Sequence, residues 1–178
     1  EFTSDGKILI TERPGRLRIF ENDELSVPVK GLPEINAEGQ GGLLDIALDT
    51  DFINNKILFF SYSAGNLLGI GTEVSSAKLV NDELKELKLL FKALPKSRGG
   101  RHFGSRLLLT NDNSLYITLG DRGEMKRAQN INDHAGSLIR INKDGEIPKD
   151  NPFTKRSDAK AEIYTYGNRN IQGIALNP

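Results

Sequence analysis

The 178-residue chain contains no cysteine. This absence excludes disulfide bonds and thiolate metal sites, although it does not fix the cellular compartment. No apolar run approaches the roughly 18 residues that a membrane-spanning helix needs, so the sequence predicts no membrane span. An excess of charge of one sign is also missing, because 24 Lys and Arg residues balance 24 Asp and Glu residues. The balance gives no electrostatic reason to expect nucleic acid as a partner.

Three common catalytic signatures are absent as well: the phosphate-binding loop, the serine nucleophile elbow and the metalloprotease helix motif. What the chain does contain is 18 glycines and many short apolar runs bounded by turn residues. Runs of this kind are too short for ordinary helices and favour β-strands. The sequence therefore predicts an all-β protein.

The stretch Arg101–Gly123 shows the pattern most clearly. Two apolar runs, Leu107–Leu109 and Leu115–Leu119, flank the turn signal Asn111–Asn113. The second run is rich in β-branched and aromatic residues, which strands favour. The two runs are predicted to pair as a hairpin through that turn.

The same unit recurs along the chain. Gly41–Asp51 leads into Lys56–Tyr62, and Gly173–Pro178 begins the unit again. Three equivalent leucines occur 61 and then 67 residues apart: Leu48, Leu109 and Leu176. A strand hairpin that recurs at intervals of roughly 40 to 70 residues indicates a β-propeller, with one blade in each repeat.

The remaining strands follow from turn signals and alternation. We expect them over residues 7–11, 15–20, 25–33, 72–79, 84–94, 137–141 and 162–166. Leu84–Leu94 also has helical spacing, but its place in the repeat favours an outer strand. Ser63–Gly71 is predicted to be a mobile loop, and Gly173–Pro178 a final inner strand.

A polar residue precedes each inner strand: Gln40, His102 and Arg169. The innermost strands of a propeller run along its central axis, so their starts lie on a ring around one mouth of the channel. His102 could accept a proton near neutral pH. Arg169 and Asn170 could orient an anion or a carbonyl oxygen. Gln40, which lies among glycines, could donate from a loop that approaches its neighbour closely.

Each of these residues has a structural alternative. A single loop histidine is more often structural, Arg169 could form a surface ion pair with Glu162, and the glycines around Gln40 could make a plain turn. Gly120–Gly123 is interpreted as a blade turn, which leaves Asp121 without a catalytic role. Asp133 and His134 lack a spaced third ligand, so no metal site is predicted in the chain.

Six segments together carry a family resemblance. The chain resembles the soluble dehydrogenases of glucose and aldose sugars that depend on pyrroloquinoline quinone (PQQ), also called the glucose/sorbosone dehydrogenase family. The segments cover nearly the whole chain in the family's order: Thr11–Gly15, Gly39–Leu48, Arg101–Arg106, Leu115–Gly123, Gly145–Phe153 and Tyr166–Ala175.

The resemblance implies a six-bladed β-propeller, with about three blades in residues 1–178, and a partial domain that is incomplete at both ends. It implies that His102 takes the proton from the sugar C1 hydroxyl while hydride passes to PQQ, giving a lactone. Arg169 and Asn170 match the pair that contacts the quinone, and Gln40 matches a polar residue on the substrate side. Arg101 precedes His102 where glucose-oxidising members carry an Asp that would orient the base.

Further expectations come from the resemblance alone. They are a calcium ion with ligands beyond this chain, an external electron acceptor, and a periplasmic or secreted location. These residues alone are expected to be inactive, and a homodimer stays open. Two other function classes also stay open: a non-catalytic extracellular propeller that serves as a binding scaffold, and a lactonase-like propeller with an axial metal.

Overall fold

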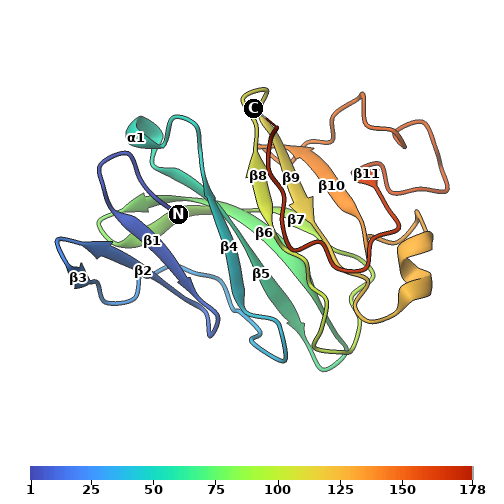
Figure 1. Cartoon of the computed structure of the whole chain (residues 1–178), viewed down its shortest axis with the longest axis horizontal. Coiled ribbons are helices and arrows are strands. Elements are labelled where there is room, and N and C mark those ends of the chain that lie inside the picture. The colour runs from blue at the N-terminus through green and yellow to red at the C-terminus, as the bar shows by residue number, and fades with distance from the viewer. Residues whose placement is uncertain (178) are drawn as a thin grey trace.

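The computed structural model describes residues 1–177 and folds them into three antiparallel sheets (Figure 1). The first sheet contains β1 (Ile8–Glu12), β2 (Arg16–Glu21) and β3 (Glu24–Leu25). The second contains β4 (Leu43–Leu48), β5 (Ile57–Asn66), β6 (Gly69–Val80) and β7 (Glu83–Lys92). The third contains β8 (Leu107–Leu109), β9 (Ser114–Thr118), β10 (Leu138–Asn142) and β11 (Ile163–Thr165). In each sheet the strands follow one another in chain order, the meander that is typical of propeller blades.

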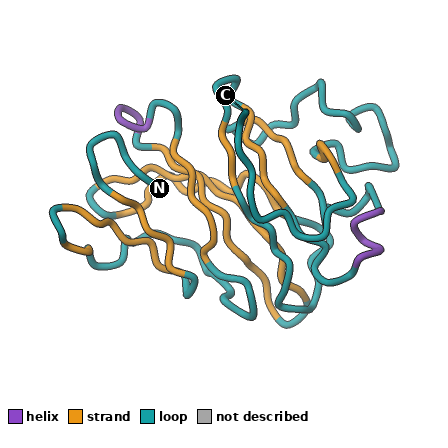
Figure 2. Tube along the Cα trace, viewed as in Figure 1, coloured by secondary structure: helices purple, strands orange, loops and turns teal. Residues whose placement is uncertain are grey.

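Helix is scarce in the described residues (Figure 2). The only helical elements among residues 1–177 are α1 (Phe52–Asn55) and the 3₁₀ helix η1 (Met125–Gln129). The prediction of an all-β fold is confirmed. None of these helices is long and apolar enough to cross a membrane.

The three sheets pack against one another through two hydrophobic cores. Along β5, Leu58, Phe60 and Tyr62 belong to the core shared with the first sheet, whereas Phe59 belongs to the core shared with the third. Successive strand residues point to opposite faces, so this central strand is buried on both sides. The second core is filled from the third sheet mainly by Leu115, Ile117, Ile139, Ile141 and Ile163.

The inner strands are β4 and β8, and β4 packs beside both β1 and β8 (Figure 1). A hydrogen bond from Leu107 N to Asp45 Oδ2 (2.9 Å) joins the starts of β8 and β4. In the view of Figure 1 the chain enters both strands from below. The segments that precede them therefore meet at one end of the molecule, which we call the mouth.

Several strand predictions are confirmed by the register. Leu107 pairs with Ile117 and Leu109 with Leu115, which is the predicted hairpin. The ambiguous stretch Leu84–Leu94 is a strand, because β7 pairs along most of β6. Two-residue turns of the left-handed type, which twisted hairpins favour, lie between β2 and β3 and between β6 and β7: Asn22-Asp23 and Asn81-Asp82.

The predicted mobile loop over Ser63–Gly71 is wrong. β5 and β6 continue to pair as far as Asn66 and Gly69, which leaves only Leu67 and Leu68 in the turn. Pairing also extends from Ile70 to Ser97 on the next segment. The small residues in this stretch are required by close packing rather than by flexibility, since a Cβ on Gly69 would lie 3.0 Å from the Lys96 backbone.

Two other strand predictions also fail. The outer strand expected over Leu25–Pro33 ends at Leu25, because the following chain contains Pro28 and turns away at Gly31 (φ 87°). The inner strand expected over Gly173–Pro178 is not formed by residues 173–177, and Pro178 lies outside the described residues. Ile174–Leu176 instead lie along β8, where they share a groove with Leu108, and they have no strand partner among the described residues.

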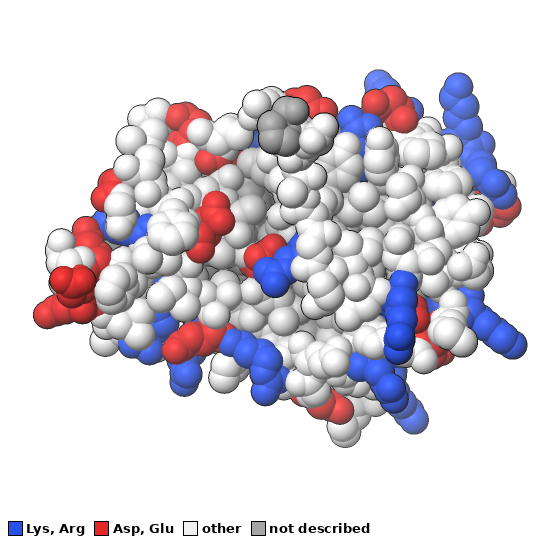
Figure 3. All heavy atoms as spheres, viewed as in Figure 1, with Lys and Arg blue, Asp and Glu red and all other residues white. Residues whose placement is uncertain are grey.

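Charged side chains of both signs are interspersed on the face shown in Figure 3, mostly around its rim. The middle of this face is largely uncharged. The surface view thus agrees with the zero net charge of the sequence.

Candidate active site

Two loops at the mouth are joined to each other. The first mouth loop (residues 36–42) precedes β4, and the second mouth loop (residues 96–105) precedes β8. Gln40 N donates to Gly100 O at 2.6 Å, and His102 N donates to Gln40 Oε1 at 2.8 Å. Gly39 has a φ of 59°, and a Cβ on it would lie 2.2 Å from Gly100 O. This glycine is therefore required by the close approach of the two loops, and a plain turn does not account for it.

Arg13, in the turn between β1 and β2, also holds the first mouth loop. Its Nη1 donates to the carbonyl oxygens of Ala37, Gly39 and Gly41 at 2.9, 2.7 and 3.1 Å. The backbone on both sides of Gln40 is thereby fixed from the neighbouring sheet.

His102 is oriented by a carboxylate. Its Nδ1 lies 2.7 Å from Oδ1 of Asp121, which is 1% exposed. The same oxygen accepts the N–H of Gly123 at 2.7 Å. Because a carboxylate only accepts hydrogen bonds, the neutral imidazole carries its proton on Nδ1 and its lone pair on Nε2. Within residues 1–177, Nε2 has no hydrogen-bond partner, so the arrangement presents a basic nitrogen on a side chain that is 15% exposed.

Asp121 is a functional candidate that the sequence analysis assigns to a turn alone. It does form the turn, since its carbonyl oxygen accepts the N–H of Glu124 at 3.0 Å. Its carboxylate, however, also orients His102. The residue directly before His102, where the family resemblance leads us to expect an orienting Asp, is Arg101 in this chain. The one sequence signal for Asp121 is an acidic residue three positions after the end of a buried strand, β9, because a buried acid must find a partner.

The third mouth loop (residues 166–172) completes the site. Asn170 Oδ1 accepts the N–H of Gly104 at 3.0 Å, and Arg169 O accepts the N–H of Asp121 at 2.8 Å. The exposed guanidinium of Arg169 forms no hydrogen bond or ion pair within residues 1–177. Its suggested partner Glu162 bonds to His134 instead. The backbone of Arg169 thus holds Asp121, the residue that orients His102, in place.

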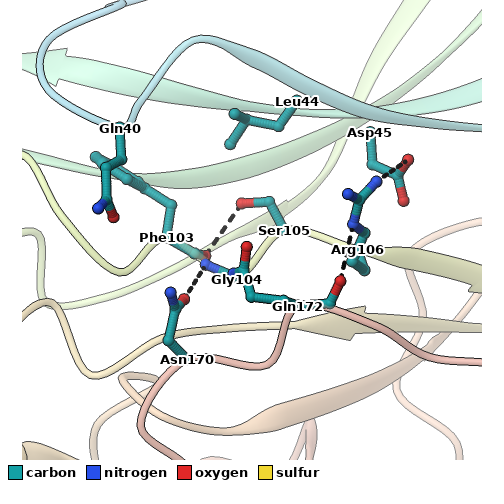
Figure 4. A pocket seen from close by; sticks show the side chains of 9 residues that line it. All are labelled: Gln40, Leu44, Asp45, Phe103, Gly104, Ser105, Arg106, Asn170 and Gln172. Carbon is teal, nitrogen blue, oxygen red and sulfur yellow. Dashed lines mark hydrogen bonds and ion pairs between the residues drawn. The ribbon is translucent and has the colours of Figure 1, made fainter.

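A cavity of about 320 Å³ opens between the three loops (Figure 4). Gln40 and Asn170 lie on its wall, and the chain from Phe103 to Arg106 crosses it. Both carboxamide oxygens already accept backbone N–H groups. Their NH₂ groups are therefore left as donors. At the other side, Arg106 Nη1 pairs with Asp45 Oδ1 at 3.2 Å.

Gly120 allows this close packing. A Cβ on Gly120 would lie 2.2 Å from His102 O and 2.7 Å from Asn170 Oδ1. Only a residue without a side chain lets the strand end beside Asp121 touch both loops.

His134 and Asp133 each pair with a neighbouring side chain in the fold. His134 is buried, accepts the N–H of Leu94 at Nδ1 (2.8 Å) and donates from Nε2 to Glu162 (2.8 Å). Burial raises the pKa of Glu162, but the hydrogen bond from His134 and nearby positive charge more than offset it, so this pKa lies below its ordinary value. Asp133 binds the guanidinium of Arg127 through both oxygens, at 2.8 and 3.0 Å.

Among residues 1–177, no group of three or more His, Cys, Asp or Glu side chains could hold a metal ion. Calcium, which takes six to eight oxygen ligands, has no site formed by the described residues alone. No catalytic step is derived for it.

Known proteins are similar to this chain over nearly its whole length. A family model described as Glucose / Sorbosone dehydrogenase matches residues 1–178. The chain belongs to the glucose/sorbosone dehydrogenase family. It is 42% identical, over 96% of its length, to an aldose sugar dehydrogenase of Escherichia coli, and 32% identical, over 98%, to a quinoprotein glucose dehydrogenase B of Acinetobacter calcoaceticus.

Solved structures of sugar dehydrogenases share the fold. A glucose dehydrogenase superimposes on the whole chain with a TM-score of 0.95 at 37% identity and is covered over 57% of its own length. A PQQ-bound aldose sugar dehydrogenase of Streptomyces coelicolor matches 94% of the chain with a TM-score of 0.81, covered over 49% of its length, and at 22% identity this likeness concerns the fold alone. The chain covers 47% of the E. coli relative and 42% of the Acinetobacter one, about half the length of these curated relatives.

Proposed function

We propose that the full-length protein carrying this chain is a PQQ-dependent aldose sugar dehydrogenase, which oxidises the C1 hydroxyl of an aldose to a lactone. The observation that carries the proposal is the pair of His102 and Asp121. In the neutral tautomer it leaves Nε2 as an acceptor, on a residue that directly precedes the segment Phe103–Arg106, which lines the cavity together with the amide side chains of Gln40 and Asn170. Family membership and the names of the relatives support the substrate class.

His102 is the proposed base. Nε2 takes the proton of the C1 hydroxyl as the C1–H bond breaks, and the resulting imidazolium is stabilised by the Asp121 carboxylate on Nδ1. General base catalysis of this kind contributes about 10² to 10⁴-fold in rate. PQQ, when bound, supplies the acceptor for the hydride that leaves C1.

The other predicted residues hold and orient. The NH₂ group of Gln40 donates to a sugar oxygen in this proposal. Its side chain lies beside the proposed base, because Gln40 Oε1 accepts the backbone N–H of His102. Asn170 and Arg169 donate to carbonyl or carboxylate oxygens of the quinone. A polyanionic, carbonyl-rich ring fits an amide donor next to an exposed guanidinium, which offers a planar fork of donors. These groups would also stabilise negative charge that develops on the acceptor oxygens.

The finer properties of the protein are proposals that rest on the resemblance. They are a six-bladed propeller completed by residues outside this chain, calcium bound by those residues, an external electron acceptor, and export to the periplasm or cell exterior. Fractionation of cells that produce the natural protein tests the last of these.

The function is tested by loading the full-length protein with PQQ and calcium and measuring dye-linked oxidation of a panel of aldoses. We expect quinone-dependent turnover that falls about 10² to 10⁴-fold in His102→Ala. His134→Gln is the matched control, because it alters the structural histidine and leaves the mouth intact. Failure of the wild-type protein to bind PQQ would overturn the proposal and favour a non-catalytic scaffold.

A further inference from the structure

The segment Gly99–Phe103 carries His102 in a conformation that needs support. His102 has a φ of 55°, in the left-handed region that residues with a Cβ seldom adopt. The segment forms no strand of its own. Such a backbone persists only where neighbouring groups hold it in place.

Gln40 holds this segment from the first mouth loop, and Arg122 holds it from the turn after β9. Arg122 Nη1 donates to Arg101 O at 2.5 Å, and its Nη2 donates to Gly99 O. Its guanidinium carbon lies 3.5 Å from the centre of the Phe103 ring. Arg122 therefore holds the backbone before His102 and stacks on the ring after it, and it directly follows Asp121, which holds the imidazole.

The burial of the Arg122 cation costs free energy. Arg122 is 8% exposed, its Nε is buried without a hydrogen-bond partner, and its acceptors in residues 1–177 are carbonyl oxygens only. Burial and the neighbouring Arg127, opposed in part by Glu124, lower the pKa of Arg122 to about 10. A buried cation without a bonded carboxylate is costly. Arg127, in contrast, is paired with Asp133.

We infer that Arg122 is a positioning residue for His102: its guanidinium holds the backbone before the histidine and stacks on the Phe103 ring after it, while Asp121 fixes the imidazole. This inference rests on the proposed function, in which His102 is the base. Two successive side chains of one turn thus set both the position and the tautomer of a single catalytic group. Without Arg122 the ring still reaches Asp121, but the segment that carries it keeps only its hydrogen bonds to Gln40 and can shift.

The test compares Arg122→Gln, Arg122→Lys and the control Arg127→Gln in the full-length protein with PQQ and calcium. A shift of about 1 Å in a reacting group costs on the order of 10²-fold in rate. We expect kcat to fall by about that factor in Arg122→Gln, with a much smaller change in KM. Arg122→Lys keeps a cation for the carbonyls but loses the planar stack on Phe103, and its kcat lies between. Arg127→Gln loses stability and keeps the kcat of the folded protein.

A second readout does not depend on turnover. In nitrogen-15 NMR spectra, His102 of the wild-type protein gives the signature of a single tautomer with Nδ1 protonated, and Arg122→Gln averages this signature while Arg127→Gln preserves it. If the wild-type protein oxidises no aldose, the proposed function fails and the spectra still decide the positioning role. If Arg122→Gln does not fold, Arg122→Lys decides it in the same way. An Arg122 variant whose His102 signature and kcat both match those of Arg127→Gln overturns the inference.

Discussion

The hydrogen bond between His102 and Asp121 predicts that two substitutions of Asp121 differ in their effect on activity. In Asp121→Asn, the N–H of Gly123 still requires an acceptor, so the amide oxygen takes the place of Oδ1. That oxygen also accepts the Nδ1 proton of His102, and the geometry is preserved. In Asp121→Ala, both donors lose their acceptor in a site where residue 121 is 1% exposed.

The magnitudes follow from these contacts. A hydrogen bond to a charged group contributes about 1.5–3 kcal/mol and a neutral one about 0.5–1.5 kcal/mol. Asp121→Asn therefore loses about 1–1.5 kcal/mol of stabilisation of the imidazolium, close to tenfold in kcat/KM. Asp121→Ala also releases the ring from its tautomer and position, so its loss approaches the full contribution of a general base, about 10² to 10⁴-fold.

The assay is dye-linked aldose oxidation by the full-length protein loaded with PQQ and calcium, corrected for the folded fraction. The ratio between the two variants is the informative quantity. Equal losses in Asn and Ala would show that the negative charge, rather than the orientation, is what matters. Wild-type rates in both would refute any role for Asp121.

Three further predictions concern the same framework. The pKa of Glu162 is lowered from its ordinary value of 4.5 in the folded protein, so its pairing with His134 stabilises the fold above that pH and this stabilisation is lost as the pH falls. Glu162→Gln should therefore lower the unfolding free energy at pH 7, and the difference from wild type should shrink below pH 4.5. Denaturant titrations measure this difference, and a difference that is constant with pH would contradict the prediction. Gly120→Ala should abolish activity and lower the melting temperature, since its Cβ would lie 2.2 Å from His102 O; an active variant of unchanged melting temperature would refute the packing. Ile139→Ala, at a fully buried position between the second and third sheets, should cost about 2–5 kcal/mol of unfolding free energy, and a loss below 1 kcal/mol would argue against the stacked sheets.

Much of the fold follows from local sequence. The hairpin of β8 and β9 is predicted from two apolar runs and an Asn-rich turn, and its register is the expected one. The starts of the inner strands are predicted from the repeat, and the structure brings Gln40 into direct contact with His102. The catalytic and binding roles of Gln40, His102, Arg169 and Asn170 stay predictions.

The failures have physical causes. Ser63–Gly71 has the composition of a loop, yet pairing with the neighbouring strand and with Ser97 overrides local propensity. The hairpin of β6 and β7, in contrast, has a local signal, because its turn Asn81-Asp82 repeats the turn Asn22-Asp23. Asp121 is 19 residues from His102, and no local pattern shows that a turn carboxylate meets a loop histidine from across the blade. Tertiary contacts of this kind are decided by packing and by the need to pair a buried charge.

The central claim is that His102 Nε2 is the base. Its most direct test is His102→Gly in the full-length protein with PQQ and calcium, assayed with and without added imidazole. We predict a loss of about 10² to 10⁴-fold in kcat, partly restored by imidazole in a concentration-dependent way because the truncated side chain leaves space at the mouth. A His102→Gly protein that binds PQQ and oxidises the aldose at the wild-type rate would contradict the claim.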